Sequence, residues 1–184
     1  MPTIMTHAVA GIALTRLLTP RPSLALMSAC AFCAMLPDAD VVSFAAGVPY
    51  GDMLGHRGLT HSLAFALAVG AAVGAWTKSA RTALCIGLAT VSHGLLDALT
   101  NGGLGVGFLI PFSADRYFFP WTPIQVSPIG LGFFSARGLS VFASELLWVW
   151  LPCAFISAAN FHSNPAPETL ESGWKRKTPT EPPP

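Results

Sequence analysis

Charged residues are scarce in this chain. Asp, Glu, Lys and Arg together make up 10% of its 184 residues, whereas hydrophobic residues make up 52%. A soluble domain carries about 25% charged residues, so this composition argues against a soluble protein. The formal net charge is only +1, which argues against a nucleic-acid-binding surface. The chain is therefore predicted to be an integral membrane protein of one compact domain.

Other absences narrow the functional classes. The sequence has no Gly-x-Ser-x-Gly motif, no P-loop and no dinucleotide-binding fingerprint. Its N-terminus lacks the basic region of a cleaved signal peptide, so we expect the first apolar stretch to be retained. Cys30 and Cys33 form a Cys-x-x-Cys pair, a spacing that also occurs in redox and zinc sites. Because both lie within an apolar run, helix packing is the favoured interpretation.

The hydrophobic residues are concentrated in five segments that suit helices. Crossing about 30 Å of hydrocarbon takes about 20 helical residues. The last two segments meet that length, and the first two are short. The predicted fold class is all-α: a polytopic membrane bundle of about four or five helices, with apolar segments at 6–18, 23–36, 61–76, 80–99 and 139–159.

A long segment without helical pattern, from Gly102 to Gly138, is rich in proline, glycine and aromatic residues. It is expected to form a loop on one face of the bundle. A poorly ordered interfacial connector and a lid over a substrate are both open interpretations. Residues 163–184 have the proline-rich polar composition of a disordered tail, here expected to be cytoplasmic, which leaves 1–162 as the membrane domain.

Basic residues predict the orientation in the membrane. They occur in the turn after the first segment, in the turn after the third and in the C-terminal tail. Five alternating helices place all three regions on one side, which the positive-inside rule assigns to the cytoplasm. The protein is therefore predicted to lie in the inner (cytoplasmic) membrane. The opposite, outer face then receives the N-terminus and both long loops.

Histidines and aspartates are found at the ends of the apolar segments, where ionisable groups are costly unless they are paired, solvated or bound to a metal. Imidazole and carboxylate together suit a first-row divalent ion. His93 and Asp97 are four residues apart, on one helical face. Asp38 and Asp40 would share a face in an extended segment. All the candidate ligands fall on the predicted outer side, and they are His7, Asp38, Asp40, His56, His61, His93 and Asp97.

Further polar residues have two interpretations each. Arg57 and Arg116 could contact a phosphate and stabilise negative charge in a transition state, or they could be salt-bridged arginines at the interface. Glu145 is a buried-acid candidate, near the ligands or paired with an arginine. Thr6 and Thr60 are expected to be N-caps, each placing a histidine at the start of a helix.

These motifs support a resemblance. With His7, LPDAD, HRGLTHS and SHGLLDALTNGG, the first 140 or so residues resemble the membrane-bound metal-dependent hydrolases, also called LexA-binding, inner-membrane-associated hydrolases. The segment PFSADRYFFPW looks like a conserved loop of that family and places Arg116 at its polar position. The family is distantly similar to zinc-dependent phospholipase C and P1-type nucleases. The resemblance implies phosphoester hydrolysis with zinc, and the single His-x-x-x-Asp motif favours one or two ions.

The sequence therefore predicts a membrane-bound hydrolase that cleaves a phosphoester, in a lipid or lipid-linked molecule, with a metal-activated water. In this hypothesis Asp40 accepts a proton and Arg57 or Arg116 contacts phosphate. Two other classes remain open: a metal or proton transporter, and a non-catalytic scaffold with a structural metal. The location of the polar residues at helix ends disfavours transport, because transporters place coupling sites near the bilayer midplane.

Overall fold

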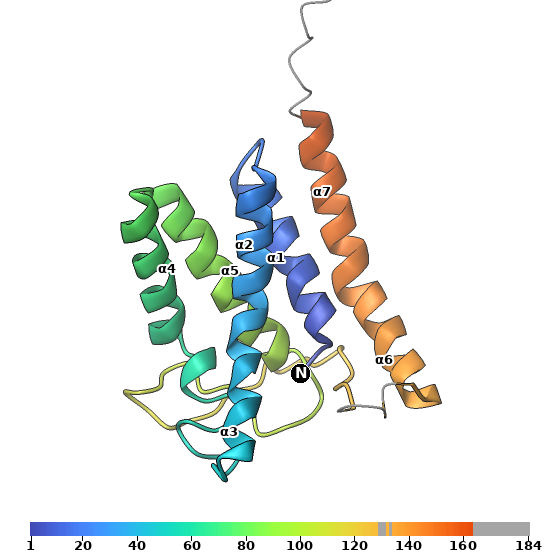
Figure 1. Ribbon diagram of the computed structural model, residues 1–184. Coiled ribbons are helices and arrows are strands. Elements are labelled where there is room, and N and C mark those ends of the chain that lie inside the picture. Colours follow the sequence, from blue (N-terminus) through green and yellow to red (C-terminus); the bar gives the residue numbers. More distant parts are fainter. Residues whose placement is uncertain (129–131, 133, 164–184) are drawn as a thin grey trace, which may run out of the picture.

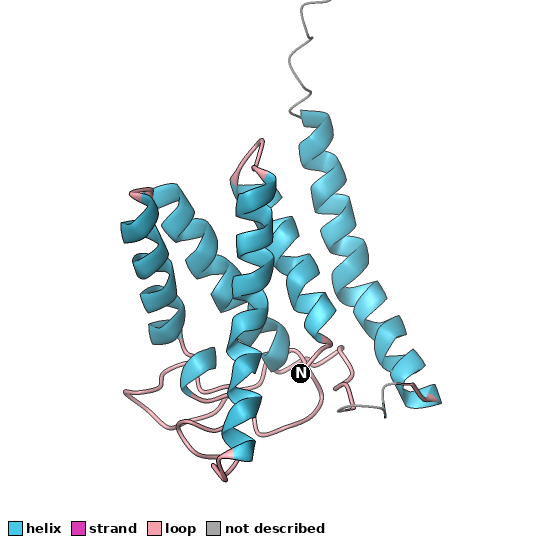
Figure 2. Cartoon of the chain, viewed as in Figure 1, coloured by secondary structure: helices cyan, strands magenta, loops and turns pink. Residues whose placement is uncertain are grey.

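The computed structural model describes residues 1–128, 132 and 134–163, and these form an all-α bundle (Figures 1 and 2). The predicted fold class is confirmed. Within the described residues the only β-type pairs are two isolated bridges. Five long helical stretches follow the predicted apolar segments: α1 (Ile4–Leu18), α2 (Leu24–Met35), α4 (Leu63–Thr77), α5 (Ala80–Ala98) and a C-terminal stretch made of α6 (Ala136–Glu145), the π-helical turn η4 (Leu146–Trp150) and α7 (Leu151–Ser163).

Among the described residues, two helical stretches are long and apolar enough to cross a membrane. One is Ala136–Ala159, with a mean hydropathy of 1.7; the other is Leu24–Ala45, with a mean hydropathy of 1.5. The second arises because α2 continues through a 3₁₀ helix, η1 (Leu36–Val41), into the short α3 (Val42–Ala45).

The segment 80–99, expected from its length to be a full-length span, is not one of these two stretches. Helix α5 has 19 residues, but it carries Arg81, His93 and Asp97, which lower its hydropathy. It lies inside the bundle, where it packs against α1, α2 and α4. This interior position suits a helix that bears polar side chains.

Small side chains let the inner helices approach closely. Cys30 and Cys33 are buried, unbonded to any other cysteine, and pack in the hydrophobic core with Cys85 and Ile86. The packing interpretation of the Cys-x-x-Cys pair is thus confirmed. A Cβ at Gly11 would lie 2.7 Å from the carbonyl oxygen of Cys30, so α1 and α2 can touch only because that position is glycine.

Three local predictions are wrong. Helix α1 begins before Thr6, with Thr3 as its N-cap. Helix α4 begins after Thr60, because the hydroxyl of Ser62 accepts a backbone N–H of the first turn. The segment LPDAD is not extended but forms the 3₁₀ helix η1.

The two ends of the bundle differ in chemistry. The α1–α2 turn, the α4–α5 turn and the end of α7 lie at one end, as Figure 1 shows. The first two of these hold the basic residues Arg16, Arg21, Lys78 and Arg81. The start of α1, the end of α2, the start of α4 and the end of α5 lie at the opposite end. The separation predicted from sequence is therefore present. The predicted tail, apart from Ser163, lies outside the described residues.

The loop after α5 closes the second end of the bundle (Figure 2). Val106, Ile110 and Ile124 from this loop are buried. Its backbone bonds to the rest of that end: the N–H of Gly107 donates to the carbonyl of Arg57, and the N–H of Leu63 donates to that of Phe108. These contacts attach the loop to the bundle, whereas other loop side chains, such as Phe112 and Trp121, are exposed.

Candidate metal centre

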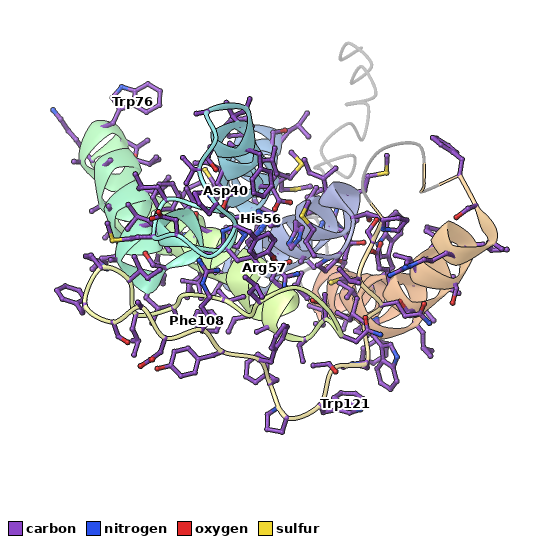
Figure 3. All side chains as sticks on the ribbon, turned by 90° about the horizontal axis from the view of Figure 1, so that it is seen from below. Asp40, His56, Arg57, Trp76, Phe108 and Trp121 are labelled. Atoms are coloured by element: carbon purple, nitrogen blue, oxygen red, sulfur yellow. The ribbon has the colours of Figure 1, made fainter. Side chains whose placement is uncertain are left out.

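All seven predicted ligand residues lie at the end of the bundle that the loop closes. In Figure 3, which views this end, Asp40, His56 and Arg57 lie close together near its centre. Each ligand candidate is at most 8% exposed. They come from α1 (His7), η1 (Asp38, Asp40), the following loop (His56), the 3₁₀ turn η2 (Leu59–His61), and α5 (His93, Asp97).

Four of these side chains form an inner group: Asp38, His61, His93 and Asp97. One ligand atom from each lies within 4.8 Å of all the others. The Nε2 atoms of His61 and His93 are 3.0 Å apart, and His93 Nε2 is 3.3 Å from an oxygen of Asp38. His61 Nε2 is 3.5 Å from Asp97 and 3.8 Å from Asp38. Ligand atoms bound at about 2.0–2.1 Å around a tetrahedral zinc are roughly 3.3–3.4 Å apart. The observed separations of 3.0 to 3.8 Å lie on both sides of that spacing.

The histidine tautomers also suit a metal. His93 Nδ1 lies 2.7 Å from the carbonyl oxygen of Ala34, which can only accept, so Nδ1 carries the proton. His61 Nδ1 faces the Asp40 carboxylate at 3.2 Å. In each neutral ring the lone pair is then on Nε2, and the two lone pairs face each other. Carbonyl or carboxylate partners on the other nitrogen are typical of metal-bound histidines.

Several buried polar atoms of the inner group and of the adjacent His7 lack hydrogen bonds. They are both oxygens of Asp38, both oxygens of Asp97 and both ring nitrogens of His7. Such atoms are rare in native proteins and call for a partner. Three buried carboxylates (Asp38, Asp40, Asp97) with one buried guanidinium (Arg57) leave two net negative charges when the imidazoles are neutral. A divalent cation therefore fits both the unpaired atoms and the charge.

The same negative charge acts on His61. Burial lowers the pKa of its imidazole, but the neighbouring carboxylates of Asp40 and Asp97 outweigh burial and raise that pKa to about 9. Metal ions and protons compete for such nitrogens.

Asp40 contacts the ligands rather than completing the inner group. Its Oδ1 is 2.7 Å from His56 Nδ1, and its Oδ2 accepts from the Thr60 hydroxyl and the Arg57 backbone N–H. Asp40, His56 and His61 could hold an ion by proximity alone. However, 2.7 Å is a hydrogen-bond distance and is shorter than the donor spacing around zinc. The geometry favours Asp40 as the residue that orients the two histidines.

His7 lies on the other side of Asp97. Its ring stacks on that of His93, with centroids 3.7 Å apart, and its Nε2 is 3.6 Å from Asp97 Oδ1. His61 approaches the other oxygen, Asp97 Oδ2. Asp97 can therefore contact two ligand sets through its two oxygens. This arrangement suits either a second ion or a fifth ligand to the first.

The two predicted phosphate-binding arginines both contact protein acceptors. Arg57 is fully buried; its Nε forms an ion pair with Asp97 Oδ2 at 2.9 Å without a well-aligned hydrogen bond. Its other two nitrogens donate to the Gly102 carbonyl and the Thr100 hydroxyl. Arg116 donates to the carbonyls of the loop before Arg57, including that of His56 at 3.0 Å. Both guanidinium groups thus hold the loops in place around the ligands.

Glu145 is buried and does not belong to either group of candidate ligands. It accepts hydrogen bonds from the Thr3 N–H and hydroxyl, each at 2.6 Å, and from the Thr6 hydroxyl at 2.7 Å. The expected arginine or ligand partner is replaced by the start of α1, where a carboxylate also meets the positive end of the helix dipole. Since His7 follows Thr6, Glu145 helps to fix its position.

Some contributing residues were not singled out from the sequence. Thr60 was assigned as an N-cap, whereas its hydroxyl donates to Asp40. Its place within HRGLTH, between two candidate ligands, is a signal for that role. Thr100 in the motif DALTNGG is a similar case, since it contacts Arg57. The carbonyl of Ala34 has no side-chain signal at all.

A helical membrane protein with a buried His/Asp cluster at one end is the class that fold and site define. The chain belongs to the YdjM inner membrane protein family, whose model matches residues 1–163. It is 43% identical over 164 residues to the Inner membrane protein YbcI of Escherichia coli (strain K12). The alignment covers 83% of this chain and 92% of that relative. No solved structure matches. The inner-membrane localisation predicted from sequence agrees with the family.

Proposed function

We propose that this protein is a membrane-bound, metal-dependent hydrolase that cleaves a phosphoester, with zinc as the expected ion. The observation that carries the proposal is the inner group: four buried side chains whose ligand atoms lie within 4.8 Å of one another, with carboxylate oxygens that lack hydrogen bonds. A divalent cation, when bound, supplies a Lewis acid that polarises a phosphoryl oxygen and lowers the pKa of a water. The family resemblance in LPDAD and SHGLLDALTNGG points to the same chemistry.

The side chains have distinct roles in this proposal. Asp38, His61, His93 and Asp97 would hold one ion, and His7 with Asp97 would extend the site. Asp40 orients His56 and His61 through hydrogen bonds and is the nearest carboxylate to a proton released at His56. Arg57 keeps the Asp97 carboxylate in place, and Arg116 fixes the loop that carries His56.

Metal removal tests the proposal. Detergent-purified protein is assayed against a panel of phosphomonoesters and phosphodiesters, including phospholipids, before and after chelation. We expect at least one substrate to be cleaved, the activity to be lost on chelation, and zinc to restore it. A bound metal stabilises the transition state of such a reaction by several kcal/mol. A stabilisation of about 4 kcal/mol corresponds to a roughly 10³-fold higher rate.

Two results would contradict the hydrolase assignment. One is bound metal whose removal lowers the thermal stability while no phosphoester is cleaved, which is the behaviour of a structural metal. The other is metal uptake into proteoliposomes without hydrolysis, which is the behaviour of a transporter.

We also propose that the metal centre faces the outer side of the inner membrane. The basic turns lie at the end of the bundle opposite the ligands, and basic turns favour the cytoplasm. A reporter that is active only in the cytoplasm, fused after residue 184, should be active. A reporter in the α4–α5 turn, at Lys78, should behave in the same way. Activity only of an extracytoplasmic reporter at these positions would reverse the orientation.

A further inference from the structure

A cavity of about 490 Å³ lies beside the metal centre, between the start of α1 and the end of the α2–α3 stretch. Binding sites for small molecules are commonly cavities of this size with mostly apolar walls and a few polar groups. Most of the lining side chains are apolar here too. The lining residues are Met1 to Met5, Val41, Phe44, Tyr50, His56, Ser127 and Pro128.

His56 connects the cavity to the ligands. It belongs to the cavity wall, and its ring lies 5.5 Å from that of His61, centroid to centroid. Its Nδ1 is held by Asp40. Tyr50 and Phe44 meet the same ring edge-on, at 5.2 and 5.9 Å. A molecule in the cavity would thus have its polar end at His56 and its remainder among apolar side chains.

The other walls of the cavity are continuous with exposed apolar surface of the bundle. Val41 and Phe44 belong to the candidate span Leu24–Ala45 and are 42% and 39% exposed. Ile4 and Met5, at the start of α1, are 49% and 67% exposed. Each of these residues both lines the cavity and reaches the outer surface of the bundle. An apolar chain in the bilayer could therefore enter from the side without crossing water.

A second apolar groove, between α4 and α5, provides a comparison. Its lining runs from Leu63 to Val91 and includes Leu67 and Leu84, but it includes none of the seven candidate ligands. The cavity beside His56 is thus distinguished by its polar end and by its contact with the metal centre.

We propose that this cavity binds the acyl chain of a lipid phosphoester and places the phosphate of that lipid next to His56. The chain-binding part rests on the apolar walls and their continuity with exposed apolar surface of the bundle. The placement of the phosphate rests on the proposed hydrolase function. The substrate class is then a membrane lipid with an anionic phosphate, since the cation expected at the ligands complements that charge.

Photolabelling tests the binding part without any need for activity. The probe is a phosphatidic acid with a diazirine in its acyl chain, present at low level in phosphatidylcholine vesicles that contain the metal-free wild-type protein. Mass spectrometry should find the label on cavity residues, above all around Val41 and Phe44. Val41→Phe narrows the cavity and should lower that labelling at least about fivefold, in line with the discrimination typical of apolar pockets. The matched control is Val42→Phe, since Val42 is 70% exposed and does not line the cavity.

Label spread evenly over the outer helix faces, or labelling that is equal in Val41→Phe and Val42→Phe, would overturn the inference. A hydrolysis assay distinguishes a failure of this inference from a failure of the proposed function. If the label maps to the cavity and no phosphoester is cleaved, chain binding stands and the hydrolase proposal fails. If long-chain phosphoesters are cleaved in preference to short-chain ones, Val41→Phe should lower that preference about tenfold relative to Val42→Phe. An unchanged preference would be consistent with the hydrolase proposal and would contradict the acyl-chain site.

Discussion

Replacing His93 with alanine is expected to remove most of the bound metal and, with it, the hydrolytic activity. His93 supplies an Nε2 lone pair 3.0 Å from that of His61 and 3.3 Å from Asp38. Structural zinc sites with four ligands bind with about 10–16 kcal/mol. Divided over four ligands, that is roughly 3 kcal/mol each, or about a 100-fold loss of affinity. Elemental analysis of the purified variant at limiting zinc measures the loss.

The matched control is Ser92→Ala. Ser92 is the neighbouring residue on α5, and its hydroxyl only donates to the carbonyl of Ala89. This variant should keep the metal and the activity. A second measurement separates lost metal from lost structure: chelation should lower the melting temperature of the wild type and of Ser92→Ala, but not that of His93→Ala. A His93→Ala protein with its full complement of metal would show that His93 is a packing residue.

The second large effect is expected at Arg57. This side chain is fully buried and pairs with Asp97 at 2.9 Å. Removal of one partner from a buried ion pair costs about 3–5 kcal/mol, because the other charge is left without compensation. Arg57→Met should therefore lower the free energy of unfolding in detergent by about that amount. Arg57 has a φ of 62°, and methionine meets the same backbone cost, so the effect isolates the guanidinium.

Two further variants test the cause of that effect. The double variant Arg57→Met, Asp97→Asn should lose less free energy of unfolding than the sum of the losses in the two single variants. Arg57→Met leaves the Asp97 carboxylate without a compensating charge, and Asp97→Asn removes that carboxylate. Arg116→Met provides the comparison, since Arg116 is only half-buried and its described contacts are with loop carbonyls. Its cost should be smaller. A loss below about 1 kcal/mol for Arg57→Met, typical of an exposed pair, would contradict the assignment of a buried ion pair.

Much of the bundle could be predicted from the sequence, because the information is local. Apolar runs separated by proline, glycine and basic turns mark the helices. Basic turns alternate with His/Asp-rich segments, and this alternation predicts which helix ends lie at the same end of the bundle. The Cys-x-x-Cys pair was assigned to packing from its apolar surroundings, and Cys30 and Cys33 are indeed in the core. The full-length span Leu24–Ala45 was not predicted, because Pro37 was taken as the end of a helix. The chain instead continues there in a 3₁₀ helix.

The gathering of the seven candidate ligands also followed from the topology. Their individual roles did not, because roles depend on which atoms meet. Asp40 was expected to be a metal ligand or a proton acceptor, and the structure adds that it contacts two imidazoles, a hydroxyl and a backbone N–H. Glu145 was expected near the ligands or an arginine, yet it holds the first turn of α1. Glu145 and Thr3 are more than 100 positions apart in the sequence. A pairing of this kind leaves no local pattern from which it could be predicted.

X-ray absorption spectroscopy of the zinc-loaded, detergent-purified protein tests the central claim most directly. We predict about one or two zinc ions per chain, bound by imidazole nitrogen and carboxylate oxygen at about 2.0–2.2 Å, with at least two imidazoles per chain. In Asp97→Asn the bound zinc should fall sharply, because Asp97 contacts both His7 and His61. The absence of stoichiometric zinc, or a shell with sulfur at about 2.3 Å from the buried cysteines, would contradict a metal centre built from these histidines and aspartates.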